Sequence, residues 1–289
     1  MEKTFCYVNG QIVDSQFAMV SVFDHGFTVA DGVFETLKLS SGSVFALDRH
    51  LDRLEHSCFG LGITCPNREL IRKAVSEVCA KNNSIDYGRL RITVTSGAGP
   101  LGSDRLQSQP TLVISVAPQS QWPSTAQLLI MPWARNETSP LVTVKTTSYA
   151  ENVHALAIAK SFDFSEAIFL NTQGKVTEGT GSNIFFVKDR VIFTPDKTSG
   201  LLQGVTRNLV IEWAATKFEI RESSVSEENL FNADEIFITS TTRDVQPVSR
   251  LARLDNSHRI TKEAVYEIGS VTQEIALLFK SQSQQMSNP

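Results

Sequence analysis

The sequence predicts a mixed α/β (α+β) chain of two domains, and three observations support this prediction. Segments with the two-residue alternation of strands recur between segments with the spacing of amphipathic helices. The chain of 289 residues is long enough for one large domain or two of medium size. Pro118–Pro123 places two prolines among polar residues, which is typical of a linker. We therefore expect a small first domain over residues 1–117, a linker over 118–124 and a larger second domain over 125–289.

The first domain is expected to contain strands followed by two helices and two more strands. Asn9-Gly10 predicts a hairpin turn. Asp48 is expected to cap one helix, and a second helix is expected to begin at residues 66–67. The strand-like segments of this half are 5–8, 18–21, 32–39, 44–46, 89–95 and 111–117.

The second domain is also expected to mix strands and helices. Its strand-like segments are 126–131, 141–147, 167–171, 183–188, 190–194 and 235–240. The spacing of apolar residues predicts helices over 150–161, 205–218 and 261–280. The segment 281–289 is rich in serine and glutamine, and we expect it to be disordered.

Composition excludes several classes of protein. The contents of 41% apolar and 20% charged residues are typical of a globular chain. The net charge of −4 argues against a nucleic-acid partner, and no apolar stretch is long enough to span a membrane. Met1–Phe5 lacks the pattern of a signal peptide, and the four cysteines show no metal-ligand spacing. We therefore expect a cytoplasmic protein with free thiols, no metal and no membrane partner.

The first residue that suggests chemistry is Lys145, which falls in the apolar strand predicted over 141–147. Val142 and Val144 form one face of this strand, so Lys145 projects from the other face. A lysine in the middle of a strand costs desolvation free energy unless its charge is relieved, as an imine linkage would do. The alternative is a lysine on an edge strand, exposed to water.

A carboxylate and several anion contacts accompany this lysine. Glu178 begins a Gly/Ser-rich turn, and Gly204 precedes an amphipathic helix whose first N–H groups are suited to an anion. Arg49 lies in the first turn of its helix, where its positive charge opposes the helix dipole. This placement is unfavourable unless an anion lies nearby. Taken singly, each of these residues has a plain alternative as a solvated side chain or an ordinary helix start. Together with Lys145 they would hold a pyridoxal 5′-phosphate through a Schiff base, a pyridine-nitrogen contact and a phosphate site.

In combination these residues resemble the class IV pyridoxal-phosphate family, also called fold type IV. The family contains branched-chain and D-amino-acid aminotransferases, R-selective amine transaminases and 4-amino-4-deoxychorismate lyases. The positions that match its signature are Glu178, Thr180, Asn183, Ile184, Phe185, Ile192, Phe193, Thr194, Leu202, Gly204, Val205 and Arg207. The resemblance implies a small N-terminal α/β domain, a larger barrel-like C-terminal domain and a homodimer.

The resemblance also implies roles for individual residues. Lys145 is expected to be the catalytic residue, forming the Schiff base and moving a proton at the substrate's Cα. Glu178 is expected to contact the pyridine nitrogen. The other residues expected to bind the cofactor are Arg49, Tyr149, Ser182, Val205, Thr206, Ser240 and Thr241. The residues expected to contact substrate are Phe27, Val29, Phe34, Arg91, Thr242 and Arg243, with the loop 96–109 beside them.

The predicted function is an aminotransferase that moves an amino group between an amino acid or primary amine and a 2-oxo acid. The alternative is an aminodeoxychorismate lyase, which eliminates pyruvate and releases 4-aminobenzoate. The stretches 145–152 and 96–102 resemble lyases, whereas Ser240–Thr242 and the Glu178 turn equally resemble D-amino-acid aminotransferases. A binding protein that kept the fold and lost the chemistry is a third hypothesis, which the presence of Lys145, Glu178 and Arg49 disfavours.

Overall fold

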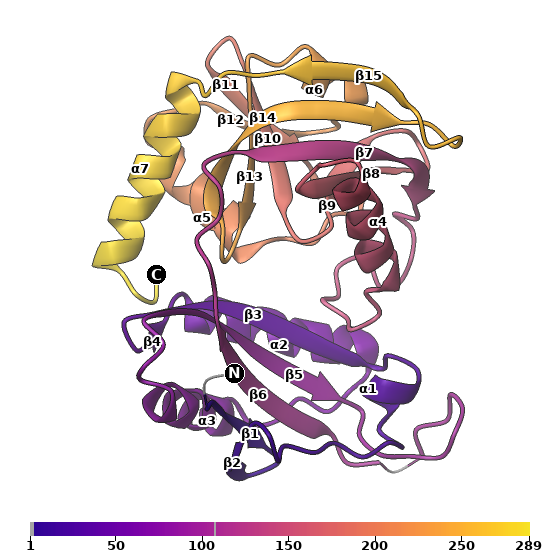
Figure 1. Ribbon diagram of the computed structural model, residues 1–289, viewed down its shortest axis with the longest axis vertical. Helices are drawn as coiled ribbons and strands as arrows, with labels where there is room; N and C mark the ends of the chain where they lie inside the picture. Colours follow the sequence, from indigo (N-terminus) through magenta and orange to yellow (C-terminus); the bar gives the residue numbers. More distant parts are fainter. Residues whose placement is uncertain (1–2, 107) are drawn as a thin grey trace. The chain divides into compact units, whose positions relative to one another are not determined.

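The computed structural model describes residues 3–106 and 108–289, and these residues form two compact units (Figure 1). The first unit contains the chain up to Gln121 together with Val144–Ser148 and Met286–Pro289. The second unit contains Trp122–Thr143 and Tyr149–Gln285. The segment with Lys145 therefore belongs to the first unit, although it follows the start of the second along the chain. The domain boundaries expected from the sequence, at 118–124, stay a prediction.

The first unit is built on a six-stranded sheet that two helices cover on one face. Along β3 the side chains of Val33, Leu37 and Leu39 are buried, as period-two alternation requires. They pack against α2 (Leu47–Leu61) and α3 (Arg68–Lys81). In spatial order, the strands are β2 (Gln11–Asp14), β1 (Phe5–Val8), β6 (Thr111–Pro118), β5 (Tyr87–Thr95), β3 (Gly32–Ser40) and β4 (Ser43–Val44). A short helix, α1 (His25–Thr28), precedes β3.

A buried charge cluster interrupts the apolar face of β3. Glu35 is fully buried, and its carboxylate accepts two hydrogen bonds from Arg53, at 2.7 and 2.8 Å, and contacts His50 Nδ1 at 2.7 Å. Burial alone would raise the pKa of Glu35, but the Arg53 guanidinium and His50 outweigh it and hold this pKa far below its usual range. Burial, together with the charges of Arg53 and Lys145, lowers the pKa of His50 even though Glu35 opposes this shift. His50 is therefore neutral near pH 7.

The second unit is built on a nine-stranded sheet with apolar residues on both faces. In β7, Leu128 and Ile130 face one core cluster, whereas Leu129 and Met131 face another, which also contains α4 (Ala150–Ser161). Parallel pairing of β7 with β8 and β14 fits this burial on both sides. In spatial order, the strands are β12 (Ile220–Ser223), β11 (Val191–Pro195), β10 (Asn183–Lys188), β13 (Glu235–Ser240), β14 (Asp244–Leu254), β7 (Ala126–Arg135), β8 (Glu166–Asn171) and β9 (Val176–Gly179), with β15 (Ile260–Val265) paired to β14.

Two long helices pack together against this sheet on the side away from α4 (Figure 1). They are α5 (Val205–Ala214) and α7 (Ser270–Gln285), and the rings of Trp213 and Phe279 meet between them with centroids 5.1 Å apart. Glu235 fixes the start of α7, because its carboxylate accepts the N–H groups of Val271 and Thr272. Shorter helices are η1 (Lys197–Ser199) and α6 (Glu227–Phe231). None of the helices in the described ranges has the length and apolar character needed to cross a lipid bilayer.

Several expectations from the sequence are wrong in this structure. The partner of β1 across the Asn9-Gly10 turn is Gln11–Asp14, not 18–21. The segment 141–147 is a turn followed by a single bridge residue, because its Lys145 end pairs with a distant strand. The expected helix over 261–280 is strand β15 followed by α7, which also orders much of the segment expected to be disordered.

The start of α2 also differs from the expectation. Asp48 does not cap this helix, because the chain enters it through Ala46 in the left-handed conformation, with φ of 56°. Asp48 lies inside the first turn, where its carboxylate pairs with Arg68 and Arg72 of α3. The Asp48 carboxylate therefore links α2 to α3 and does not cap the start of α2.

The buried His50 makes stability depend on pH. The pKa of His50 is lower in the folded chain than its unfolded value of about 6.5. As the pH falls through about 6.5, the unfolded state takes up a proton that the folded state does not, so the free energy of unfolding decreases. We expect His50→Gln to reduce the fall in Tm between about pH 7.5 and 5.5, measured by circular dichroism. The exposed His56→Gln in the same helix is the control, and equal pH dependence in both variants would contradict this assignment.

Candidate active site

The segment that carries Lys145 lies along the N-terminal end of β3, to which a single β-bridge between Val33 and Thr146 joins it. Phe34 N–H donates to the Lys145 carbonyl at 2.9 Å, and Thr147 N–H donates to the Gly32 carbonyl at 2.8 Å. From α2, the Ser57 hydroxyl accepts the Lys145 N–H at 3.1 Å. The backbone of Lys145 is thus fixed from two sides, which sets the direction of its side chain.

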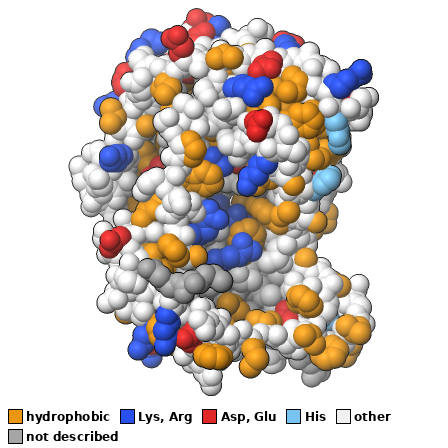
Figure 2. Space-filling model, viewed as in Figure 1, with side chains coloured by type: hydrophobic (Ala, Val, Ile, Leu, Met, Phe, Trp, Pro, Cys, Tyr) orange, Lys and Arg blue, Asp and Glu red, His pale blue; other side chains and the backbone are white. Residues whose placement is uncertain are grey.

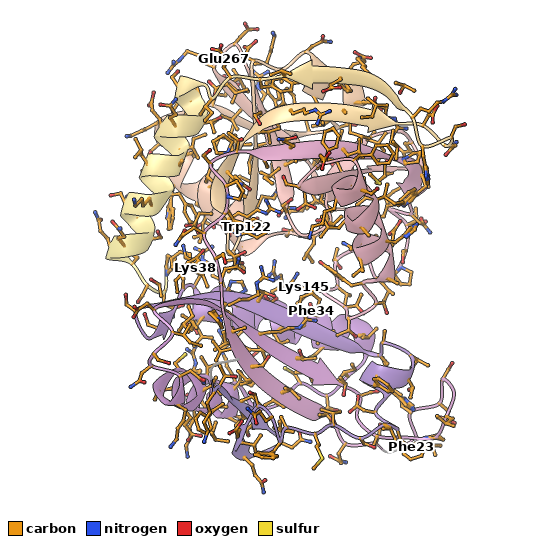
Figure 3. The ribbon with its side chains drawn as sticks, in the orientation of Figure 1. Phe23, Phe34, Lys38, Trp122, Lys145 and Glu267 are labelled. Carbon is orange, nitrogen blue, oxygen red and sulfur yellow. The ribbon has the colours of Figure 1, made fainter. Side chains whose placement is uncertain are left out.

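The amine of Lys145 lies over the aromatic ring of Phe34, a residue of β3 (Figure 3). Its Nζ is 4.4 Å from the ring centroid of Phe34, and the guanidinium carbon of Arg91 is 3.6 Å from the same centroid. Arg91 also donates to Thr93 on its own strand at 3.3 Å. The structure therefore brings together Lys145, Phe34 and Arg91, which the sequence analysis placed in one site.

Two arginines of α2 have different surroundings. Arg49 Nε donates to the Pro289 carbonyl at 2.9 Å, so its side chain reaches the end of the chain. Arg53 lies one helical turn before Ser57 and is held by the buried Glu35. The sequence analysis gave Arg53 no role. The signal that could have found it is Glu35, an acid at an apolar position of a strand that requires a buried cation.

In the second unit, Glu178 lies in β9 and is held as an acceptor. Its carboxylate contacts Arg135 Nη1 at 3.0 Å, the Leu202 N–H at 2.9 Å and Asn183 Nδ2 at 3.4 Å. Arg135 in turn stacks on the Phe169 ring at 3.8 Å from its centroid. These contacts join Glu178 to the segment that leads into α5.

The N-terminus of α5 approaches this segment closely. Gly204 precedes the helix, and a Cβ at this position would lie 2.1 Å from Asn183 Oδ1, so a larger residue would displace the Asn183 side chain. Gly204 has no side chain to cap the helix, and Val205 and Thr206, which follow it, are buried. The first N–H groups of α5 keep the positive end of the helix dipole. Such N–H groups are suited to an anion, and the anion site expected from the sequence stays a prediction.

The turn after β13 contains four residues expected to contact cofactor or substrate. Ser240 ends the strand and Thr241 follows it, both half-buried. Thr242 accepts a hydrogen bond from Trp122 Nε1 at 3.4 Å. Arg243 is almost fully buried, and its guanidinium lies 3.7 Å from the Trp122 ring and 3.4 Å from a Glu166 oxygen. Glu166 also accepts a hydrogen bond from Ser182 at 3.2 Å.

The remaining expected residues are less enclosed. Tyr149 is the N-cap residue of α4 and is half-buried. Phe27 and Val29 are exposed, at 76% and 46%. In the loop after β5, Arg105 pairs with Asp31 at 2.5 and 2.6 Å and donates to the Gly62 carbonyl, so this basic residue fixes the loop. Gln107, in the loop 96–109 expected beside the substrate, lies outside the described residues.

Comparison with known proteins places the chain in a family. A family model described as amino-transferase class IV matches residues 32–251. A protein of Methanocaldococcus jannaschii assigned as a branched-chain-amino-acid aminotransferase is 35% identical over 281 residues, which cover 95% of this chain and 94% of that protein. An aminodeoxychorismate lyase of Bacillus subtilis is 30% identical over 289 residues, covering 97% and 95% of the two chains.

A solved structure agrees with this placement. The branched-chain aminotransferase of Thermoproteus uzoniensis, determined with norvaline, superposes with a TM-score of 0.87 at 28% identity, covering 96% of this chain and 94% of that chain. The prediction of a fold type IV α/β architecture is thereby confirmed. With the family model spanning most of the sequence, the chain belongs to the class IV aminotransferase family and is an enzyme of the transaminase type.

Proposed function

We propose that this chain uses pyridoxal 5′-phosphate to move an amino group between an amino acid or primary amine and a 2-oxo acid. The observation that carries the proposal is Lys145, whose backbone is fixed by Phe34 and Ser57 and whose amine lies over the Phe34 ring. An amine held in this way is suited to form a Schiff base with an aldehyde. The same amine would carry a proton to and from the substrate's Cα.

The residues of each unit fit the chemistry of this cofactor. The first unit supplies the amine of Lys145. The second unit supplies Glu178, a carboxylate that Arg135 and the Leu202 N–H hold in place, and the open N-terminus of α5. Such a carboxylate favours a protonated ring nitrogen, and the helix end favours a phosphate. When bound, the cofactor supplies a ring that accepts electrons from the bond broken at Cα.

We infer that Arg49 contributes a cation to the phosphate, as the resemblance implies. The Arg53 guanidinium is already paired with the buried Glu35 carboxylate, which makes it the poorer partner for a second anion. The Arg49 side chain, by contrast, contacts a backbone acceptor, the Pro289 carbonyl. Ser182, Val205, Thr206, Ser240, Thr241 and Tyr149 remain the other proposed cofactor contacts.

The relatives favour a branched-chain amino acid as the first donor to test. Both the M. jannaschii protein and the T. uzoniensis enzyme carry branched-chain names. Phe34 and Arg91 lie beside Lys145, so among the expected substrate contacts these two are best supported. Phe27, Val29, Thr242 and Arg243 stay predicted substrate contacts.

A second candidate function is the pyruvate-eliminating lyase. The B. subtilis aminodeoxychorismate lyase, 30% identical over nearly the whole chain, supports it. The two reactions share proton removal by a lysine and differ in the next step, which returns the proton on the cofactor side in a transaminase and expels a leaving group in the lyase. The sequence similarity of the two groups therefore cannot separate them, and a substrate panel can.

We also propose that the protein is a cytoplasmic homodimer. Figure 2 shows apolar side chains gathered over the part of the first unit that carries α1. The strongly exposed apolar residues of this region are Phe17, Met19, Val22, Phe23, Phe27, Leu101 and Leu106. Exposed apolar residues in this density are typical of a surface that another chain covers. The free cysteines, three of them buried, fit a reducing compartment.

A donor panel tests the proposed reaction. With L-leucine, D-alanine or R-1-phenylethylamine, the visible band of the cofactor should shift to that of the amine form, and 2-oxoglutarate should restore it. Lys145→Ala should lower kcat by at least about a thousandfold and change the cofactor spectrum, because the chain would lose its nucleophile and proton carrier. Lys160→Ala, at an exposed position of α4, is the control. Pyruvate release from aminodeoxychorismate without an acceptor, and no shift with any amine donor, would favour the lyase instead.

The phosphate contact is tested by comparing two arginines. We expect Arg49→Gln to weaken pyridoxal phosphate binding by roughly ten- to a hundredfold, the scale of one lost charge-assisted contact of about 1.5–3 kcal/mol. Arg53→Gln should mainly lower Tm, because it leaves the buried Glu35 carboxylate without its cation. The dissociation constant is measured by absorbance titration, with circular dichroism to follow folding. Unchanged cofactor affinity in Arg49→Gln would reject Arg49 as the phosphate contact.

The oligomeric state is tested by charging the apolar surface. The parent should sediment at about twice the chain mass of 31.9 kDa. Met19→Glu, at a side chain that is 82% exposed, should raise the dimer dissociation constant by at least roughly tenfold, since a buried charge is costly. Leu277→Glu, at an isolated exposed position of α7, should leave it unchanged. A parent that is monomeric at micromolar concentration would end this part of the proposal.

A further inference from the structure

Glu166 is a buried carboxylate to which neither the sequence analysis nor the proposed reaction gives a role. It is the first residue of β8, in the second unit, and its exposure is 2%. A buried carboxylate is costly unless cations and hydrogen-bond donors surround it. The groups that surround Glu166 come from the two turns that carry most of the second unit's expected cofactor and substrate contacts.

On one side, Glu166 holds the turn that follows Glu178. Its Oε1 accepts the Thr180 N–H at 3.1 Å and also the Thr180 hydroxyl, and its Oε2 accepts the Ser182 hydroxyl at 3.2 Å. The turn lies so close that a Cβ on Gly179 would be 2.4 Å from Ser182 Oγ and 3.3 Å from Glu166 Cδ. These contacts fix the backbone directly after Glu178.

On the other side, Glu166 pairs with Arg243 of the turn after β13. Arg243 Nη2 lies 3.4 Å from Glu166 Oε2, and its side chain is only 6% exposed. Arg243 Nη1 donates to Gln246 at 2.6 Å, and its guanidinium stacks on Trp122. The neighbouring Thr242 accepts from Trp122 Nε1, so the stacked ring also holds this turn.

The two turns thus share one buried ion pair and its hydrogen bonds. Groups in one such network depend on one another, and removing a single charge leaves its partner uncompensated. A substitution of Glu166 should therefore alter the conformation of both turns. A substitution in a separate surface ion pair should alter neither.

We propose that Glu166 is a positioning residue that holds the Glu178 turn and the Ser240–Arg243 turn in one arrangement, with Arg243 as the bridge between them. This rests on the proposed role of both turns in holding pyridoxal phosphate. It gives Arg243 a different task from the one expected from the sequence, which was a contact to the substrate carboxylate. Glu166 itself touches neither cofactor nor substrate in this proposal.

The test measures cofactor affinity as well as turnover. Glu166→Gln removes the charge at nearly constant volume, and we expect the dissociation constant of pyridoxal phosphate to rise roughly tenfold, the scale of coupling within one network. Arg243→Gln should raise this dissociation constant by a similar factor. The double variant should have a dissociation constant no higher than that of the single variant that binds the cofactor less tightly. Glu263→Gln, which breaks the surface pair with Arg250 in the same unit, is the matched control and should bind like the parent.

Thr180→Val provides a variant that keeps the buried ion pair. It removes only the hydroxyl that Glu166 accepts, and we expect a smaller rise in the same dissociation constant with little change in Tm. This variant decides the question if Glu166→Gln does not fold.

The outcomes separate the inference from the proposed function. A parent that binds no pyridoxal phosphate would reject the proposed function before Glu166 is considered. A parent that binds it, with Glu166→Gln and Thr180→Val binding equally well, would overturn the positioning role. An Arg243→Gln variant with unchanged cofactor affinity and a raised KM for amino acids would return Arg243 to the substrate.

Discussion

Three carboxylates of the candidate site, two of them fully buried and one partly buried, are each held by an arginine, and this pairing is the constraint on which the site's arrangement depends. Glu35 pairs with Arg53 behind the Lys145 segment. In the second unit, Glu178 pairs with Arg135 and Glu166 pairs with Arg243. An ion taken out of water is stable only with such partners, so each pair fixes two distant stretches of chain at once. Rigid placement of a reactive amine or a ring-facing carboxylate is what catalysis on a bound cofactor requires.

This arrangement is compatible with both of the reactions that are named for relatives of the chain. The M. jannaschii aminotransferase and the B. subtilis lyase resemble this sequence almost end to end. The amine, the carboxylate in β9 and the start of α5 would serve either reaction, because both share proton removal by a lysine. The distinction must come from groups that meet the rest of the substrate. Function therefore has to be argued from those groups and not from the fold.

Much of the fold was predictable where the pattern is local. The helix over 150–161 and the strand over 235–240 were found at their observed bounds, because their periodicities are unbroken. Strand β14 was missed, since Pro247 and three charged residues interrupt its alternation. Most of strand β15 was expected to belong to a helix over 261–280. Pairing with β14 decides its conformation, and that partner is invisible in the local sequence.

The site shows the same division. Lys145, Glu178 and the start of α5 were predicted from residue type and from the match to the family signature, and their roles stay proposals. Arg53 and Glu166 were not, because their importance comes from partners 18 and 77 positions away along the chain. Long-range pairing of charges leaves no periodic trace in a sequence. A buried acid such as Glu35, in an otherwise apolar face, is the one sign that such a partner exists.

The placement of Trp122 has a consequence for how this protein can be observed. All three tryptophans, Trp122, Trp133 and Trp213, belong to the second unit. Intrinsic indole emission excited near 295 nm therefore originates only there, and melting of the six-stranded sheet has no direct emitter of its own. Because the Trp122 ring stacks on Arg243 and its N–H donates to Thr242, the Trp122 contribution to this emission responds to changes in the turn after β13.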